Sequence, residues 1–302
     1  MLTRKDFLPV TLEDRDLFRA HYARYPQTHS DNTFTNMVCW NSYAHYEFAR
    51  KKGAIILAST IEGETKFRPP IGPRDPALLK ELIRLAIAEG DDTPLVLVDE
   101  ETRAWIMTLY PDLELTPDRD YFEYVYRTDD LAGLTGKQYL TIRRQLSRFR
   151  RNCSPVVEEI SPGTLGEVHD FLVEWCEWKD CDSVPFLGYE KDAVFFALDH
   201  YEELGLSGLI IRVVGKIGAI TLYEELSPST AVVHFEKGLP DCEGIYKAIN
   251  AEAATALLGR FEFINRESDM GVEGLREAKT RYHPHHMVEV YCARKDDLKR
   301  CI

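Results

Sequence analysis

The 302-residue sequence contains no long hydrophobic run. No stretch approaches the roughly 18 consecutive apolar residues that a membrane-spanning helix needs. The N-terminus, MLTRKDFLPVTLEDRD, lacks the apolar core of a signal peptide. We therefore expect a cytoplasmic protein with no membrane span.

The sequence also lacks a cysteine framework. Its seven cysteines are odd in number and irregularly spaced, which favours free thiols in a reducing compartment. Cys176 and Cys181 are the nearest pair, but no second pair or matched histidines complete a zinc site. We expect no metal site.

An excess of positive charge is absent as well, because the formal net charge is −13. This charge argues against wide non-specific binding to nucleic acid. Hydrophobic residues make up 44% of the chain and aromatic residues 11%, so the chain can bury a core. The length suits one large domain or two of ordinary size.

The second half of the chain has the clearer pattern of elements. Apolar runs at Gly208–Val214 and Ile217–Tyr223 flank Gly215-Lys216 and predict a hairpin. A further strand at Ala231–Glu236, a helix at Asp241–Leu258 and a strand at Phe261–Ile264 follow. A helix at Val272–Tyr282 and a strand at Met287–Cys292 then close the domain. This order resembles that of the GNAT acyltransferase fold.

The first half shows a looser version of the same order. Apolar periodicity predicts a helix at Pro76–Glu89 and strands at Ala54–Thr60 and Leu95–Val98. Acidic, glycine and turn residues at Thr128–Gly136 mark a domain boundary. We expect a mixed α/β fold (α+β, with mixed sheets) of two tandem GNAT-like domains, residues 1–132 and 133–302, with the chemistry in the second.

The stretch FEFINRESDMGVEGLREAKTRYHP, residues 261–284, is the most informative in the chain. An apolar strand runs directly into Asn265, Arg266, Glu267, Ser268 and Asp269. Open α/β sheets bind ligands at the carboxyl ends of their strands. The stretch therefore predicts either a structural corner held by ion pairs or the floor of a binding site.

The same stretch resembles a signature of the family related to the C-terminal domain of phosphatidylglycerol lysyltransferase. The resemblance rests on Asn-Arg-Glu-x-Asp-x-Gly from Asn265, Gly-Leu-Arg-x-Ala-Lys from Gly274, and Tyr-His-Pro from Tyr282. Upstream, HFEK at 234–237 and GIYKAIN at 244–250 also resemble sequences of this family. DNTFTNMVCW at 31–40 and FRPPIG at 67–72 resemble the family's N-terminal portion.

The resemblance implies tandem GNAT-like domains and transfer of an aminoacyl group from aminoacyl-tRNA. The acceptor would be an amine or hydroxyl, on a small molecule or a lipid head group. Two alternatives stay open: a ligand-binding or sensing protein on a degenerate GNAT scaffold, and an N-acetyltransferase that uses acetyl-CoA. No resident cofactor is expected, since aminoacyl-tRNA or acyl-CoA would serve as the donor substrate.

The expected donor loop argues against coenzyme A. Pyrophosphate usually binds the free N–H groups at a helix N-terminus. The corresponding stretch here, EKGLPDCEG at 236–244, carries Asp241 and Glu243, and Asp241 is a natural N-cap. These carboxylates would repel a pyrophosphate, although Lys237 and Lys247 would soften the repulsion.

The candidate catalytic residues are Glu236, Glu267 and Asp269. One of the last two would orient or deprotonate the acceptor amine, while Arg266 and Asn265 would bind substrate. In the structural alternative, Arg266 pairs with a buried acid such as Glu236, and Asp269 caps the helix at Val272.

Further substrate-binding candidates are Lys237, Lys247, Lys279, Tyr282 and His283. The last three lie one turn apart at a helix end. The alternative is that such cationic side chains simply favour a helix C-terminus, with Pro284 ending the helix.

The segment KQYLTIRRQLSRFRR, residues 137–151, holds six basic residues and no acid. Its apolar residues recur at helical spacing, and another face carries Lys137, Arg144, Arg148 and Arg151. This face would contact phosphates of tRNA or of an anionic head group, or it is the solvated face of an amphipathic helix.

Overall fold

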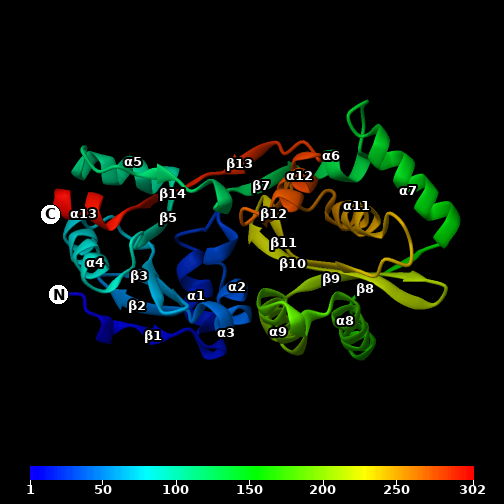
Figure 1. Ribbon diagram of the computed structural model, residues 1–302, viewed down its shortest axis with the longest axis horizontal. Coiled ribbons are helices and arrows are strands. Elements are labelled where there is room, and N and C mark those ends of the chain that lie inside the picture. The colour runs from blue at the N-terminus through cyan, green and yellow to red at the C-terminus, as the bar shows by residue number, and fades with distance from the viewer. The chain divides into compact units, whose positions relative to one another are not determined.

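Two seven-stranded mixed sheets form the framework of the chain. The structure, a computed structural model, describes residues 1–302. One compact unit, unit 1, comprises Met1–Glu123, Ser268–Glu273 and Val288–Ile302. The other, unit 2, comprises Tyr124–Glu267 and Gly274–Met287. Figure 1 labels the elements of both.

The sheet of unit 1 has the order β1-β2-β3-β4-β5-β14-β6. Its strands are β1 (Leu8–Pro9), β2 (Glu47–Lys51), β3 (Ala54–Ile61), β4 (Glu64–Phe67), β5 (Leu95–Asp99), β14 (Val290–Ala293) and β6 (Thr116–Pro117). Neighbouring strands are antiparallel except β4 and β5, which pair in parallel at Phe67 and Leu95.

The helices of unit 1 are α1 (Arg15–Tyr22), α2 (Phe34–Cys39), α3 (Asn41–Ala44), α4 (Pro76–Glu89), α5 (Glu100–Leu109) and α13 (Lys295–Cys301). Short 3-10 turns lie at Arg4–Asp6, Leu12–Asp14, Ser30–Asn32 and Arg119–Tyr121. Helix α4 has the bounds that the sequence predicts. Asp75 caps it by accepting from the Leu78 N–H at 2.9 Å, Pro76 starts it, and Leu78, Leu79, Leu82 and Ile83 are buried.

The sheet of unit 2 has the order β13-β7-β12-β11-β10-β9-β8. Its strands are β13 (His286–Val288), β7 (Glu123–Arg127), β12 (Phe263–Ser268), β11 (Thr230–Gly238), β10 (Lys216–Ser227), β9 (Ser207–Val213) and β8 (Val156–Glu159). The expected hairpin is confirmed: β9 and β10 pair antiparallel across Val214 and Gly215, both at positive φ.

Helices cover both faces of this second sheet (Figure 1). Helix α11 (Ile245–Leu257) packs on β9, β10 and β11 together with α6 (Thr128–Gly133) and α7 (Leu140–Cys153). On the other face lie α8 (Leu165–Lys179) and α9 (Pro185–Asp199). A 3-10 turn at Cys181–Ser183 connects these two helices, and α10 (Tyr201–Leu204) follows α9 in sequence. Helix α12 (Glu273–Thr280) follows β12.

The two units repeat one order of elements. Unit 1 runs β2-β3-β4, then α4, then β5 parallel to β4. Unit 2 runs β9-β10-β11, then α11, then β12 parallel to β11. In both, an antiparallel meander feeds a strand–helix–strand unit, which is the order expected from the sequence.

The expectation of one strand at Met287–Cys292 is wrong. The segment forms two strands, β13 in the second sheet and β14 in the first. The apolar pattern shows that this segment is extended, but it does not show which sheet each residue joins.

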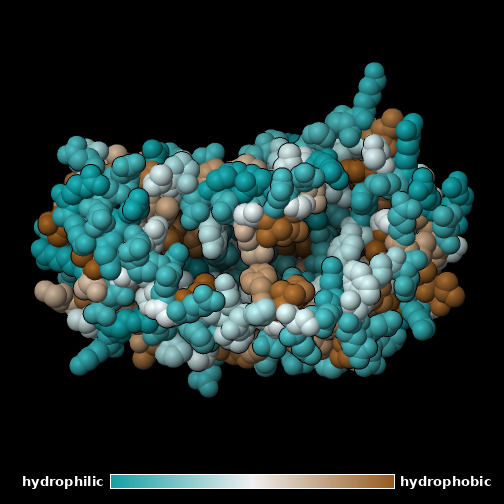
Figure 2. Space-filling model, viewed as in Figure 1, coloured by the Kyte–Doolittle hydropathy of each residue, from teal (hydrophilic) through white to brown (hydrophobic).

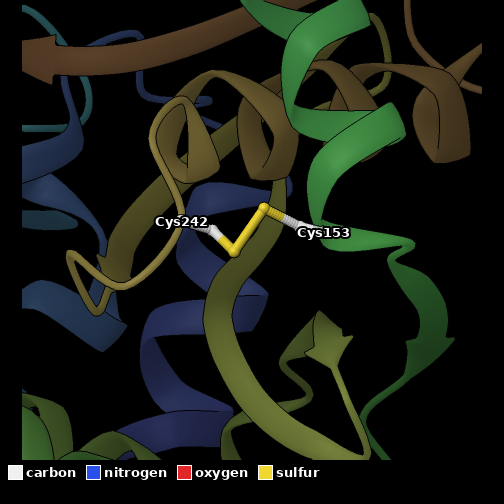
Figure 3. Close-up of a disulfide and its surroundings, with 2 residues drawn as sticks. All are labelled: Cys153 and Cys242. Atoms are coloured by element: carbon white, nitrogen blue, oxygen red, sulfur yellow. A yellow bond between two sulfur atoms is a disulfide. The ribbon is translucent and has the colours of Figure 1, made fainter.

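The expectation of seven free thiols is wrong for two of them. Cys153, the last residue of α7, forms a disulfide with Cys242 in the loop before α11 (Figure 3). The fold brings together residues that lie 89 positions apart, which spacing in the sequence does not reveal. The other five cysteines, Cys39, Cys176, Cys181, Cys292 and Cys301, are free.

Helices long and apolar enough to cross a membrane are absent from the chain. On the face shown in Figure 2, hydrophilic residues predominate and hydrophobic residues form small separate groups.

Candidate active site

The candidate site of unit 2 lies where β11 and β12 stop pairing. Their parallel register covers three pairs, from Thr230 with Phe263 to Val232 with Asn265. A register shift in the pairing of β10 with β11 leaves His234 as an extra residue between Val233 and Phe235. The side chains of the residues just beyond, on both strands, make the contacts described below.

Glu236 of β11 and Arg266 of β12 form an ion pair. In the amide orientation that satisfies its hydrogen bonds, the side-chain oxygen of Asn250 on α11 accepts from Arg266 Nε at 3.0 Å and from Arg266 Nη1 at 3.1 Å. The guanidinium lies 5.3 Å from the Tyr282 ring. Burial opposes the charged form, but the neighbouring Glu236 carboxylate raises the pKa of Arg266 above its usual range. The structural alternative of the sequence, an Arg266–Glu236 pair, is therefore present.

A second charge cluster centres on His234. Its imidazole bonds to Glu224 through Nε2 and to Glu267 through Nδ1, each at 2.9 Å. Burial disfavours the imidazolium, yet these two carboxylates outweigh burial and raise the pKa of His234 to about 10. At neutral pH His234 is thus a cation that fixes Glu267, and not a general base.

The backbone also fixes Glu267. The side-chain oxygen of the fully buried Asn265 accepts from the Glu267 N–H at 2.8 Å, and Glu267 has a φ of 60°. Lys279 of α12 donates to the carbonyl oxygens of Arg266 at 2.6 Å and Glu267 at 3.2 Å. Asn265 and Lys279 therefore hold the end of β12 in shape.

The remaining candidates from residues 279–283 differ in position. Tyr282 is buried against Arg266, and its carbonyl accepts from the Tyr139 hydroxyl at 3.0 Å. Burial raises the pKa of Tyr282 to about 12, so it stays neutral. His283 is exposed, and its ring meets the Tyr139 ring edge-on at 5.4 Å.

Asp269 belongs to unit 1 rather than to unit 2. Its carboxylate is fully buried, pairs with Arg119 at 3.1 Å and accepts from the Gly271 N–H at 2.9 Å. Its carbonyl accepts from the Val272 N–H, so Asp269 shapes the turn that leads into α12. A catalytic role for Asp269 stays a prediction.

The loop at 236–244 differs from expectation at its end. Helix α11 begins at Ile245 with Gly244 as its N-cap at a φ of 98°, so the prediction of Asp241 as the N-cap is wrong. Gly244 makes the turn into the helix two residues after the disulfide-bonded Cys242. Asp241 and Glu243 are nevertheless exposed close to the helix start.

The two lysines of this loop region are not equivalent. Lys237 is buried, pairs with Glu190 at 2.5 Å and lies 4.4 Å from the Trp175 ring. The Trp175 indole N–H donates to the Tyr246 hydroxyl at 3.4 Å. Lys247, in the first turn of α11, is half-buried. Substrate contact by either lysine stays a prediction.

Helix α7 presents most of its basic residues to solvent. Ile142, Leu146 and Phe149 are buried, as the helical spacing predicts. Lys137, which precedes the helix, and Arg144, Arg148 and Arg151 are exposed. Arg148 pairs with Glu243 at 3.2 Å.

Sequence reasoning gave His234 no role in the site, and it considered Glu224 only together with Glu225, as acidic residues that line an acceptor pocket or end a hairpin. The signal was present, because His234 and Glu224 are both polar residues within otherwise apolar strands. The bulge at His234 hid their common orientation, since it breaks the alternation by which strand residues are assigned to a face.

A carboxylate held by a buried imidazolium can take a proton from an attacking amine or hydroxyl, as acyl transfer requires. The two repeated units have the tandem GNAT-like fold. The family model "Phosphatidylglycerol lysyltransferase, C-terminal" matches residues 22–294, and the chain belongs to this family. The resemblance stated from the sequence is thereby confirmed.

Solved structures agree with this assignment. A conserved protein of unknown function from Bacteroides thetaiotaomicron is 32% identical, with a TM-score of 0.85 over 95% of this chain and 99% of that one. The C-terminal domain of a proposed lysylphosphatidylglycerol synthetase from Agrobacterium fabrum is 14% identical, with a TM-score of 0.65 over 95% and 94%.

L-PGS from Bacillus licheniformis has a TM-score of 0.64 at 14% identity, over 94% of this chain and 92% of that one. At such identities these two likenesses show the fold alone. No curated protein sequence matches the chain. Family and fold together support an acyltransferase.

Proposed function

We propose that the protein transfers an aminoacyl group from aminoacyl-tRNA to an amine or hydroxyl acceptor, such as a lipid head group. The proposal rests on family membership and on one observation in unit 2. That observation is the Glu267 carboxylate, which a protonated His234 and the Asn265 turn hold in one position.

Of the two carboxylates at the strand ends, Glu267 is the better general base. Its side chain is 26% exposed, whereas that of Glu236 is 13% exposed. Both carboxylates have a cationic partner, Arg266 for Glu236 and His234 for Glu267, so exposure decides between them. We assign proton transfer to Glu267, and we assign to Glu236, Arg266 and Asn250 the support of the strand end.

The proposed reaction has two proton transfers. The acceptor nitrogen or oxygen attacks the aminoacyl carbonyl carbon and gives its proton to Glu267. The ester bond to the tRNA 3′ oxygen then breaks, and Glu267 returns the proton to that leaving oxygen. One ester or amide bond forms for the ester bond lost, so no oxidant or metal is needed for balance.

The donor loop and α7 support tRNA over coenzyme A. Exposed Asp241 and Glu243 near the start of α11 disfavour a pyrophosphate there. Exposed Lys137, Arg144 and Arg151 offer contacts to the phosphates of a longer polyanion.

The test is a donor comparison. The protein is mixed with a labelled set of aminoacyl-tRNAs or with labelled acetyl-CoA, together with phosphatidylglycerol vesicles or a panel of free amines. We expect label to leave aminoacyl-tRNA and appear in an acceptor. Turnover of acetyl-CoA alone would support an acetyltransferase, and binding without turnover of either donor would support a sensing protein. Both results would contradict the proposal.

A further inference from the structure

Unit 1 contains a buried cation that has only neutral partners. Arg68 follows β4 directly and is 3% exposed. Its Nη1 donates to the Asp31 carbonyl at 2.5 Å and to the Asn32 side-chain oxygen at 2.7 Å. Its guanidinium lies 5.1 Å from the centre of the Tyr46 ring. None of these groups carries a negative charge.

Two hydrogen-bond donors of this region have no acceptor. Arg68 Nε is buried without a partner, and so is the hydroxyl of Tyr22 at the end of α1. The two groups lie on neighbouring segments, because His21, which precedes Tyr22, contacts the Ile71 carbonyl through Nε2 at 2.7 Å, three residues after Arg68. Burial raises the pKa of Tyr22, and the charge of Arg68 acts on it in the opposite direction. Tyr22 therefore stays a neutral donor beside the cation.

A buried carboxylate of the same unit, Glu123, is engaged by other groups. Glu123 is fully buried. Its carboxylate accepts from the Ser30 N–H at 3.0 Å and from the Ser30 hydroxyl, and lies 3.4 Å from His29 Nδ1. Ser30 and His29 thus engage Glu123, and no ion pair joins it to Arg68.

An unpaired charge and two unsatisfied donors in an interior are costly. A water molecule would satisfy the donors but not the charge. A small oxyanion would satisfy both, because each of its oxygens accepts hydrogen bonds and its charge neutralises the guanidinium.

We propose that Arg68 and Tyr22 form a second binding site, within unit 1, for a small oxyanion of the carboxylate or phosphate type. Arg68 supplies the charge and the Nε donor, and Tyr22 supplies a neutral hydroxyl. The site joins the stretches 31–40 and 67–72, which the family resemblance singled out and which aminoacyl transfer at Glu267 does not use. It is independent of the proposed transfer reaction.

The test measures thermal unfolding of the whole chain in increasing inorganic phosphate, acetate or chloride at matched ionic strength. We expect a saturable rise of the melting temperature with phosphate or with acetate, and not with chloride. The arm that saturates identifies the ligand as phosphate or carboxylate. The absence of a saturable rise in both arms would overturn the proposal.

Two variants locate the effect. Arg68→Met keeps the side-chain volume without the charge and should abolish the saturable rise, whereas Arg50→Met, at an exposed position of β2, should leave it unchanged. Tyr22→Phe removes only one hydroxyl and should weaken the affinity for the anion about fivefold to tenfold. This second variant decides the matter if Arg68→Met does not fold. An unchanged titration in Tyr22→Phe or in a folded Arg68→Met would overturn the assignment.

Discussion

The two units place charge differently at equivalent strand ends of the repeated fold, the end of β11 in unit 2 and the end of β4 in unit 1. In unit 2 the end of β11 sets Glu236 against the buried Arg266, and His234 lies between two carboxylates. In unit 1 the chain that leaves β4 sets Arg68 among neutral oxygens. Unit 2 therefore balances its buried charges with its own residues, whereas the Arg68 charge of unit 1 contacts only neutral groups of the chain.

This difference connects local charge to function. In the proposed reaction, a site whose charges are compensated holds one carboxylate, Glu267, in position for proton transfer. A site with a surplus cation is suited to binding an anion rather than to chemistry. Four predictions test the contrast.

The largest effect is expected at Glu267. Glu267→Gln keeps the hydrogen-bonding shape but cannot take a proton, so the rate of aminoacyl transfer should fall by about 100-fold or more. Single-turnover release of label from aminoacyl-tRNA measures the rate. Glu225→Gln, an exposed carboxylate beside Glu224 on β10, is the matched control and should retain the rate. A normal rate in Glu267→Gln would contradict proton transfer by this residue.

The next effect concerns stability at the two arginines. Arg266→Met leaves Glu236 buried without its cation and should cost about 3 kcal/mol of unfolding free energy. Arg68→Met removes a cation without a carboxylate partner and should cost less than about 1 kcal/mol in anion-free buffer. Urea unfolding measures both. Equal losses would show that Arg68 is as well compensated as Arg266.

The third prediction uses the pH dependence of stability. The pKa of His234 is about 10 when folded, against an ordinary 6.5. Its stabilising contribution is complete below the ordinary pKa and is lost as pH rises towards 10, because the unfolded chain releases a proton that the folded chain keeps.

Between pH 7 and 9 the wild type should therefore lose about 1 kcal/mol per pH unit relative to His234→Gln. Unfolding titrations of both proteins at several pH values give this difference, in which other titrating groups cancel. Parallel pH profiles would mean that His234 is neutral when folded.

The smallest effect is expected on α7. The double substitution Arg144→Glu and Arg151→Glu should weaken tRNA binding by roughly tenfold at moderate salt and flatten its salt dependence. Arg74→Glu, an exposed basic residue of unit 1, serves as the control. Filter binding at several salt concentrations measures the slope. An unchanged slope would assign α7 to the solvated surface.

Much of the fold could be predicted from the sequence where one pattern dominates. The bounds of Pro76–Glu89 follow from a cap, a proline and an apolar face. Helix α5 at Glu100–Leu109 was missed because only Ile106 of its face is fully buried. The division of Met287–Cys292 between two sheets depends on strand pairing, which has no local signal.

The candidate site was predicted in part. The sequence placed Asn265, Arg266 and Glu267 at one strand end, and the structure does so as well. It could not show that His234 is the cation that holds Glu267, since that contact depends on a bulge. It also could not show that Arg68 would be buried without a counter-charge, because burial and pairing emerge only from the tertiary structure.

The most direct test of aminoacyl transfer in unit 2 is a crystal structure with a hydrolysis-resistant aminoacyl-adenosine amide. The account predicts that the aminoacyl carbonyl lies beside Glu267, with the acceptor position within about 3 Å of its carboxylate or one water away. An aminoacyl group bound elsewhere in the chain, with Glu267 closed off from it, would contradict the account.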